Sequence, residues 1–356
     1  MAEETKIEQG PTAKPQDWIL VTGATGFIGR RVVENLLARG FRNIRCLVRP
    51  TSSAHTVDGL MRLARAGQRL DVIQGNLLSP DDCAAVTRGV VLVLHLAAAR
   101  GEKSIPMAYM NSVLTTRNLM EATLRHGCLR RFVSVSSFVV YTNSNKRQRD
   151  WLDETCPVEQ HPELRDSYCF AKVKQDEMVT EYGNKFGVPY VIMRPGFVYG
   201  PGNEGLTGRV GITTFGPFLH LGGGNPIPVT YVDNCADAIV AAGLAPGVEQ
   251  EVFNVVDDDL PSSRKLLRLY KQNVKKFNSY YVPHFVSYAM CYLWEWYSQW
   301  SEGQLPPAFS RKLWHNSWKK TKYTNQKLKS RAGWVQRVST EEGLRRYFEA
   351  CRNRLA

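Results

Sequence analysis

The chain has 356 residues, of which 43% are hydrophobic and 22% charged, and a formal net charge of +13. This composition is ordinary for a globular protein, so it excludes a disordered, collagen-like or coiled-coil chain, and the length suggests one large domain or two closely associated ones. There is no apolar run of about 18 residues, so no membrane-spanning helix is predicted. The polar stretch 1–17 lacks the apolar core of a secretion signal, so we expect a cytoplasmic protein.

The positive charge is concentrated toward the C-terminus. Residues 261–356 contain 19 Lys and Arg against 5 Asp and Glu, whereas residues 1–260 carry 27 positive and 28 negative side chains. The aromatic stretch 284–300 is expected to form a lid over the substrate, while the basic residues that follow it, up to 331, face solvent. The alternatives are peripheral contact with a membrane surface and binding of an acidic substrate. No nucleic-acid partner is expected, because no reader module is recognisable.

The eight cysteines are spread along the chain, and none forms a C-x-x-C pair. This spacing predicts reduced, packed thiols rather than disulfides. It also predicts no metal site, because structural zinc needs closely spaced ligands.

Short apolar strands alternate with helices after a predicted mobile tail at 1–16. We expect strands at 18–21, 44–48, 72–73, 90–94, 131–135 and 190–193, and helices at 32–37, 107–126 and 168–186. This alternation indicates an α/β fold, a doubly wound parallel sheet with helices on both faces.

A glycine-rich turn joins the first strand to the first helix. In the G-x-x-G-x-x-G spacing, Gly23 allows the tight turn, Gly26 lets the backbone approach a pyrophosphate, and Gly29 lets helix and strand pack closely. The free N–H groups of the helix start face the phosphates. We therefore predict a Rossmann-type NAD(P)-binding domain over 17–195. A smaller, interleaved substrate-binding region is predicted over 196–356, with some of its strands and helices returning to the first domain.

The end of the second strand bears on the choice of cofactor. An acidic residue there would bind the ribose 2′-hydroxyl of NAD, but this chain has Arg49, whose guanidinium can pair with the 2′-phosphate of NADP. We predict NADP, with NAD as second choice. The alternatives for Arg49 are a solvated strand-end charge or a side chain stacked on adenine.

Tyr168 and Lys172 form a Y-x-x-x-K pair on one face of a predicted helix. A free tyrosine has a pKa of about 10, and a nearby ammonium lowers it, so Tyr168 can exchange a proton with a substrate oxygen. Ser137 can hydrogen-bond the same oxygen from the end of the fifth strand, and we prefer it to Ser136 because it directly precedes 138–141. The alternative for the pair is an amphipathic helix surface.

Together these motifs resemble the extended short-chain dehydrogenase/reductases, also called the NAD-dependent epimerase/dehydratase family. The resemblance covers 18–260 and includes T-G-A-T-G-F-I-G at 22–29, H-L-A-A at 95–98 and the segments 194–202 and 231–238. It implies catalysis by Ser137, Tyr168 and Lys172, with Asn111 helping to hold a relay water, and a homodimer formed through helices 107–126 and 168–186. The implied cofactor-binding residues are Gly23, Thr25, Gly26, Phe27, Ile28, Gly29, Arg49, Asn76, Leu77, Ala97, Ala98, Tyr168, Lys172 and Pro195.

The chain differs from some branches of this family and is similar to others, which indicates the branch to which it is related. The chain lacks the Asp-Glu pair that dehydratases carry beside the active hydroxyl, and Arg49 disfavours the NAD-holding epimerases. Residues 47–52 and the C-terminal region are similar to the 3β-hydroxysteroid dehydrogenase-like and dihydroflavonol reductase-like branches. We therefore expect an oxidoreductase that interconverts a secondary alcohol and a ketone on a hydrophobic, sterol-, polyketide- or flavonol-like substrate. The alternatives are a nucleotide-sugar epimerase or reductase and a non-catalytic cofactor-binding scaffold.

Overall fold

The computed structural model describes residues 10–98, 101–102, 104–142, 150–213, 216–301 and 310–355. Its centre is a parallel sheet with the strand order β12-β7-β5-β4-β1-β2-β3. The strands are β1 (Trp18–Thr22), β2 (Asn43–Val48), β3 (Arg69–Gln74), β4 (Val90–His95), β5 (Arg131–Val135), β7 (Tyr190–Pro195) and β12 (Glu251–Val255). The strand order reverses between β1 and β4, and ligands of such sheets bind at the carboxyl ends of the strands at this point.

The central strands are buried along their whole length because helices cover both faces of the sheet. All six residues of β4 and all five of β5 are buried, whereas the edge strand β3 is half exposed. The six predicted strands are all present and their parallel arrangement is confirmed. β12 was not predicted, because its five residues include a glutamate and an asparagine and form only a short apolar signal.

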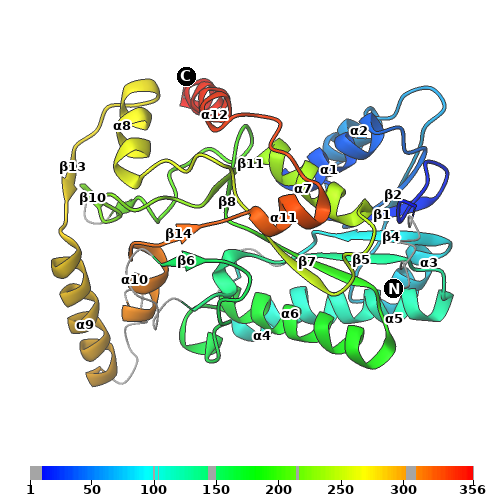
Figure 1. Ribbon diagram of the computed structural model, residues 1–356, viewed down its shortest axis with the longest axis horizontal. Coiled ribbons are helices and arrows are strands. Elements are labelled where there is room, and N and C mark those ends of the chain that lie inside the picture. Colours follow the sequence, from blue (N-terminus) through cyan, green and yellow to red (C-terminus); the bar gives the residue numbers. More distant parts are fainter. Residues whose placement is uncertain are drawn as a thin grey trace, which may run out of the picture.

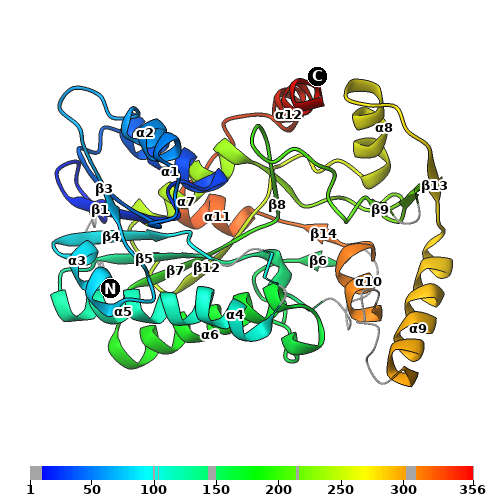
Figure 2. The ribbon, with the colours of Figure 1, turned by 180° about the vertical axis from the view of Figure 1, so that it is seen from behind.

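The helices form two layers, one on each side of the sheet (Figures 1 and 2). One layer holds α1 (Phe27–Ala38), α2 (Ala54–Met61), α7 (Val232–Leu244) and α11 (Gln326–Ala332). The other holds α3 (Pro80–Thr87), α4 (Ile105–Tyr109), α5 (Thr115–His126) and α6 (Ser167–Phe186). The predicted helix at 107–126 is interrupted by a π-helical turn, η1 (Met110–Leu114), between α4 and α5. Helices α5 and α6 end at Gly127 and Gly187, as predicted.

The remaining elements form a smaller lobe beside the carboxyl edge of the sheet (Figure 1). Its short strands are β6 (Trp151–Leu152), β8 (Phe197–Tyr199), β9 (Gly211–Thr213), β10 (Phe218–His220), β11 (Val229–Tyr231), β13 (Ser279–Tyr281) and β14 (Lys322–Tyr323). Its helices are α8 (Ser263–Asn273), α9 (His284–Trp300), α10 (Arg311–Ser317) and α12 (Thr340–Leu355). Because α7, β12 and α11 lie between these elements in sequence yet pack on the main sheet, the two lobes are interleaved.

The described part of the N-terminal segment is packed against the body. Ala13 is buried, the N–H of Thr12 donates to the carbonyl of Leu244, and the carbonyl of Pro15 accepts from the N–H of Arg42. The prediction of a mobile tail at 1–16 therefore does not hold for residues 12–16, because backbone pairing that the sequence pattern does not reveal fixes them. Residues 1–9 lie outside the described residues.

All eight cysteines are free thiols, and seven of them are buried. Burial raises the pKa of the Cys83 and Cys169 thiols to about 12, so these side chains pack as small apolar groups.

Candidate active site

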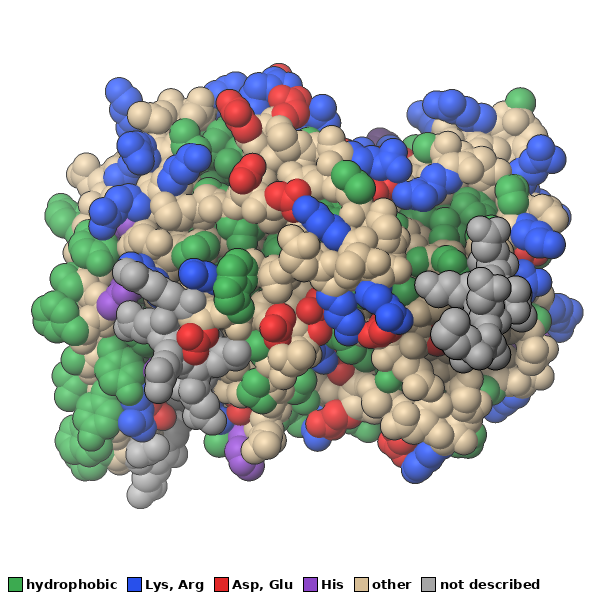
Figure 3. All heavy atoms as spheres, viewed as in Figure 1, with side chains coloured by type: hydrophobic (Ala, Val, Ile, Leu, Met, Phe, Trp, Pro, Cys, Tyr) green, Lys and Arg blue, Asp and Glu red, His purple; other side chains and the backbone are tan. Residues whose placement is uncertain are grey.

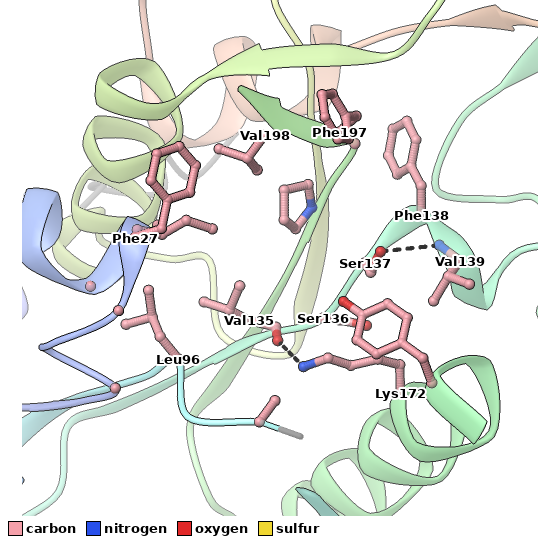
Figure 4. A pocket seen from close by; sticks show the side chains of 18 of the residues that line it. Phe27, Leu96, Val135, Ser136, Ser137, Phe138, Val139, Lys172, Phe197 and Val198 are labelled. Atoms are coloured by element: carbon pink, nitrogen blue, oxygen red, sulfur yellow. Dashed lines mark hydrogen bonds between the residues drawn. The ribbon is translucent and has the colours of Figure 1, made fainter. Parts of the chain in front are cut away.

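A cavity of about 510 Å³ lies at the carboxyl edge of the main sheet. Its wall joins the glycine turn, the end of β5, the start of α6 and the segment that follows β7 (Figure 4). The predicted residues that line it are Gly23, Gly26, Phe27, Ile28, Gly29, Ala98, Ser137, Tyr168, Lys172 and Pro195. The fold thus brings together groups that lie more than a hundred residues apart in the chain.

The glycine turn has the geometry that its spacing predicts. Gly23 has a φ of +70°, which L-amino acids with a side chain rarely adopt. A Cβ on Gly29 would lie 2.0 Å from the carbonyl oxygen of Gly23, so only glycine lets α1 approach the turn this closely. Gly26 is exposed at the N-cap of α1, and the first turn of that helix contains no acidic residue. The helix start therefore presents backbone N–H groups without competing negative charge.

Lys172 is 3% exposed, yet its ammonium has two hydrogen-bond acceptors. Nζ donates to the carbonyl of Val135 at 2.7 Å and to Oε1 of Gln175 at 2.9 Å (Figure 4). Because Val135 is the last residue of β5, the first bond ties α6 to the strand end that carries the two serines. Burial lowers the pKa of Lys172 to about 8, so the side chain is still mostly charged at neutral pH.

Ser137 and Tyr168 both border the cavity. Ser137 has an extended backbone directly before the short helix η2 (Phe138–Val140), and its Oγ accepts a hydrogen bond from the N–H of Val139 at 3.2 Å. Its hydroxyl hydrogen is not used in that bond. Tyr168 is half-buried in the first turn of α6, and it lies on the same helix face as Lys172 because four residues separate them. Both Ser136 and Ser137 line the cavity, but Ser136 is buried, whereas Ser137 is half-buried and therefore more accessible.

A chain of buried hydrogen bonds runs from Lys172 to the glycine turn. Gln175, which accepts from Lys172, donates from Nε2 to Oγ1 of Thr116 at 2.8 Å. Oγ1 of Thr116 lies 2.8 Å from Nε2 of His95, whose Nδ1 lies 2.8 Å from Oγ1 of Thr22. Burial lowers the pKa of His95 to about 3, so the imidazole is neutral. These residues hold Lys172 in place without lining the cavity.

Sequence reasoning missed Gln175 and Thr116 as parts of the site. The position of Gln175, three residues after Lys172 on a predicted helix, was a signal that the two side chains are neighbours. The contact of Thr116 with His95 was not predictable, because Thr116 lies on helix α5 and His95 at the end of strand β4.

A buried ion pair also holds α6 against the sheet. Arg194 of β7 forms an ion pair with Asp176 at 3.0 Å, and its guanidinium lies 4.7 Å from the centre of the Tyr141 ring. Burial raises the pKa of Asp176, while the neighbouring Arg194 opposes that rise. The pair joins the helix that carries Tyr168 and Lys172 to the sheet.

Some predicted site residues lie outside the lining of the cavity. Asn111 sits in η1, where its amide donates to Oε1 of Glu102 at 3.1 Å. Thr25 lies within the glycine turn. Ala97 packs closely on this turn, since a Cβ at Gly23 would lie 2.9 Å from the Ala97 nitrogen.

Arg49, Asn76 and Leu77 follow the carboxyl ends of β2 and β3. Arg49 is exposed, and no described residue forms an ion pair with its guanidinium.

The part of the cavity beyond Ser137 is mostly apolar. Phe138, Val139, Phe197 and Val198 line it together with Thr207 and Arg209. The Arg209 guanidinium donates to the carbonyl of Asn316 at 2.6 Å, which links the cavity to α10.

Comparisons with known proteins identify the family of this chain. The model of the NAD dependent epimerase/dehydratase family matches residues 19–255. Cinnamoyl-CoA reductase 1 of Oryza sativa subsp. japonica is 32% identical over 188 residues, which cover 51% of this chain and 54% of that protein. The 2-alkyl-3-oxoalkanoate reductase of Stenotrophomonas maltophilia is 26% identical over 340 residues, 92% of this chain and 97% of that protein.

Solved structures show the same fold. The crystal structure of UDP-glucuronic acid 4-epimerase from Bacillus cereus, in complex with UDP-glucuronic acid and NAD, superimposes with a TM-score of 0.70 at 21% identity. The superposition covers 95% of this chain and 100% of the epimerase chain. Because the family match spans more than half of the chain, this protein belongs to the NAD-dependent epimerase/dehydratase family, whose members are NAD(P)-dependent dehydrogenases, reductases and epimerases.

Proposed function

We propose that the protein is an NAD(P)-dependent oxidoreductase that interconverts a secondary alcohol and a ketone on a hydrophobic substrate. The observation that carries this proposal is the single cavity of about 510 Å³ into which the glycine turn, Ser137, Tyr168 and Lys172 converge. The cofactor-binding side and the proton-transfer side of a dehydrogenase site are therefore adjacent.

The glycine turn fits the pyrophosphate of a dinucleotide. The exposed Gly26 leaves room for the phosphates, and the N–H groups of the first turn of α1 supply donors. When bound, the nicotinamide ring supplies or accepts a hydride at the carbon that carries the substrate oxygen. Ala98 and Pro195, which line the same cavity, are placed to contact the cofactor.

The proton is handled by the chain itself. In the direction of reduction, the Tyr168 hydroxyl donates its proton to the carbonyl oxygen, and in the direction of oxidation the phenolate accepts it from the alcohol. The ammonium of Lys172 stabilises the phenolate, and the Ser137 hydroxyl donates a hydrogen bond that orients the substrate oxygen. Asn111 lies on the helix beside α6, where a water bound to its side chain would continue the proton path.

Arg49 supports NADP as the preferred cofactor. Its exposed guanidinium lies directly after β2 and has no ion-pair partner among the described residues. It is therefore available for bidentate hydrogen bonding to the 2′-phosphate. Asn76 and Leu77, after the neighbouring strand β3, are the proposed contacts of the adenine.

The lining beyond Ser137 supports a hydrophobic substrate. Phe138, Phe197 and Val198 offer apolar surface but few hydrogen-bonding groups. Two similar proteins are reductases by name, a cinnamoyl-CoA reductase and a 2-alkyl-3-oxoalkanoate reductase.

A nucleotide-sugar epimerase or reductase is the second candidate function. The observation that favours it is Arg209, a cation in the lining that could face a diphosphate, together with the similarity of the fold to an epimerase bound to UDP-glucuronic acid.

The two candidates separate in one assay series. Purified protein is incubated with NADPH and a panel of hydrophobic ketones and β-keto acids, and separately with nucleotide-sugars whose epimerisation is followed by chromatography. Oxidation of NADPH that depends on an apolar ketone supports the proposal. Epimerisation without net consumption of the cofactor would instead establish the second candidate.

A further inference from the structure

Helix α9 has its amphipathic pattern reversed. Its inward face carries Ser287, Cys291 and Ser298, which are buried. Its outward face, called here the α9 face, consists of large apolar side chains that are 42–76% exposed: Phe285, Met290, Tyr292, Leu293, Trp296, Tyr297 and Trp300. A helix of a globular protein normally turns its apolar face toward the core, so leaving these side chains in water is unfavourable unless something covers them.

The exposure of the α9 face follows from packing, because the rest of the helix is firmly attached. The indole N–H of Trp314 in α10 donates to Oγ of Ser287 at 2.8 Å, and the Tyr288 and Trp314 rings are 5.1 Å apart. Arg311 pairs with Glu295 at 2.8 Å. These contacts prevent α9 from rotating about its axis to bury its aromatic side chains.

A basic surface adjoins the α9 face. Residues 263–276, which form α8 and the turn after it, contain six Lys and Arg and no Asp or Glu. Five of these cations are exposed: Arg264, Lys265, Arg268, Lys275 and Lys276. Figure 1 places α8, β13 and α9 along the same end of the molecule, and Figure 3 shows Lys and Arg over α8 and hydrophobic side chains over α9 at that end.

We propose that this end docks on an anionic lipid bilayer, with α9 lying in the plane of the interface. Tryptophan and tyrosine favour the interfacial region of a bilayer, and the cations of α8 complement acidic headgroups. No helix in the described part of the chain is both long and apolar enough to cross a membrane, so the contact is peripheral. A second copy of the chain is a poor occupant, because its own basic surface would face the same positive charge.

Vesicle sedimentation of the full-length protein tests the docking surface. Vesicles of phosphatidylcholine alone are compared with vesicles that also contain phosphatidylserine. We expect binding to the acidic vesicles to be at least about tenfold stronger than to the neutral ones and to weaken with added salt. Trp296→Ser/Trp300→Ser should lower the partition coefficient about tenfold or more, because two interfacial anchors are lost.

A charge variant tests the second half of the surface without touching α9. Lys275→Glu/Lys276→Glu should weaken binding to acidic vesicles about tenfold or more and leave binding to neutral vesicles unchanged. The matched control is Leu164→Ser/Val335→Ser, which removes two side chains that are 59% and 70% exposed and lie outside α8 and α9. The control should bind as the unmodified protein does, and circular dichroism checks that each variant is folded.

Three results would overturn the proposal. The first is no binding to either kind of vesicle, and the second is equal loss in the control and in the α9 variant. The third is a change of oligomeric state in the α9 variant, measured by light scattering, without any dependence on lipid, which would identify a second copy as the occupant. A dimer formed through α5 and α6 would persist in all of these variants. Failure of the docking experiment leaves the proposed oxidoreductase activity untouched, because the residues substituted do not line the cavity.

Discussion

The ammonium of Lys172 donates a 2.7 Å hydrogen bond to the main-chain carbonyl of Val135. The bond joins a helix to the end of a strand, so the position of Lys172 relative to Ser136 and Ser137 is set by main-chain atoms. A side-chain substitution elsewhere on β5 therefore cannot remove the acceptor.

Tyr168→Phe should lower turnover at least about a hundredfold, because general acid–base catalysis contributes that much or more. Cofactor affinity should be retained, since the glycine turn is unchanged. Steady-state kinetics and fluorescence titration with NADPH measure the two effects. Tyr182→Phe is the control, because Tyr182 lies on the same helix but donates to Glu121 instead of lining the cavity. Near-normal turnover of Tyr168→Phe would leave the non-catalytic scaffold as the better account.

Gln175→Leu tests the chain of hydrogen bonds behind Lys172. Gln175 accepts from the ammonium, so its loss removes an interaction with the charged form and should lower the pKa of Lys172 below about 8. The alkaline limb of the profile of kcat/KM against pH should move to lower pH. Gln175→Glu should move it in the opposite direction, because a carboxylate stabilises the ammonium. Identical shifts in both variants would show that Gln175 only supports the fold.

Arg49→Ser should raise the KM for NADPH about tenfold and change the KM for NADH little, because only NADPH carries the 2′-phosphate. Initial rates with the two cofactors measure the ratio. Arg42→Ser is the control, since Arg42 is also exposed but precedes β2 and lies at the opposite end of that strand. Equal loss with both cofactors would contradict a phosphate contact.

His95 should make the protein sensitive to acid. Burial lowers its pKa from 6.5 to about 3, so between these values the unfolded chain binds a proton that the folded chain does not. Stability is then retained above pH 6.5 and lost as the pH falls toward 3. From pH 7 to pH 5 this residue should cost about 2 kcal/mol in the free energy of unfolding.

Urea unfolding at both pH values compares the protein with His95→Gln, which lacks the titrating ring. The difference in the free energy of unfolding between the unmodified protein and His95→Gln should become smaller as the pH falls from 7 to 5. His55→Gln changes an exposed histidine and serves as the control. A difference that is independent of pH would exclude His95 as the cause.

Asp176→Asn should destabilise the fold by about 3 kcal/mol, because it leaves the buried Arg194 without its counter-charge. Thermal or urea unfolding gives the value. Glu177→Gln breaks the neighbouring but exposed pair with Lys174 and should cost no more than about 1 kcal/mol. Similar losses in the two variants would mean that burial does not strengthen the Asp176 pair.

Local patterns were enough to predict several of the residues that line the cavity. The spacing of Gly23, Gly26 and Gly29 between an apolar strand and a helix depends only on neighbouring residues, and the structure shows the expected turn. The four-residue spacing of Tyr168 and Lys172 likewise places both on one helix face before any tertiary contact is known. The Rossmann-type sheet follows from six short apolar segments alternating with helices.

Long-range contacts were not predictable from these patterns. The hydrogen bond from Gln175 to Thr116 and the ion pair of Arg194 with Asp176 each join residues of two different elements. The sequence around one residue of such a pair does not indicate which distant residue it contacts. The packing of residues 12–16 on the body and the addition of β12 to the sheet also depend on distant partners.

The aromatic, basic C-terminal segment shows which properties the sequence determines and which only the tertiary structure decides. Its composition alone establishes that residues 261–356 carry a net charge of +14 and most of the tryptophans. Only the tertiary structure decided which of these side chains are covered: Trp314, Trp318 and Trp334 are buried, whereas Trp296 and Trp300 face outward. The reason is physical, because burial depends on which surface of a helix meets the rest of the fold, and α9 packs through the face that carries Ser287, Tyr288 and Cys291.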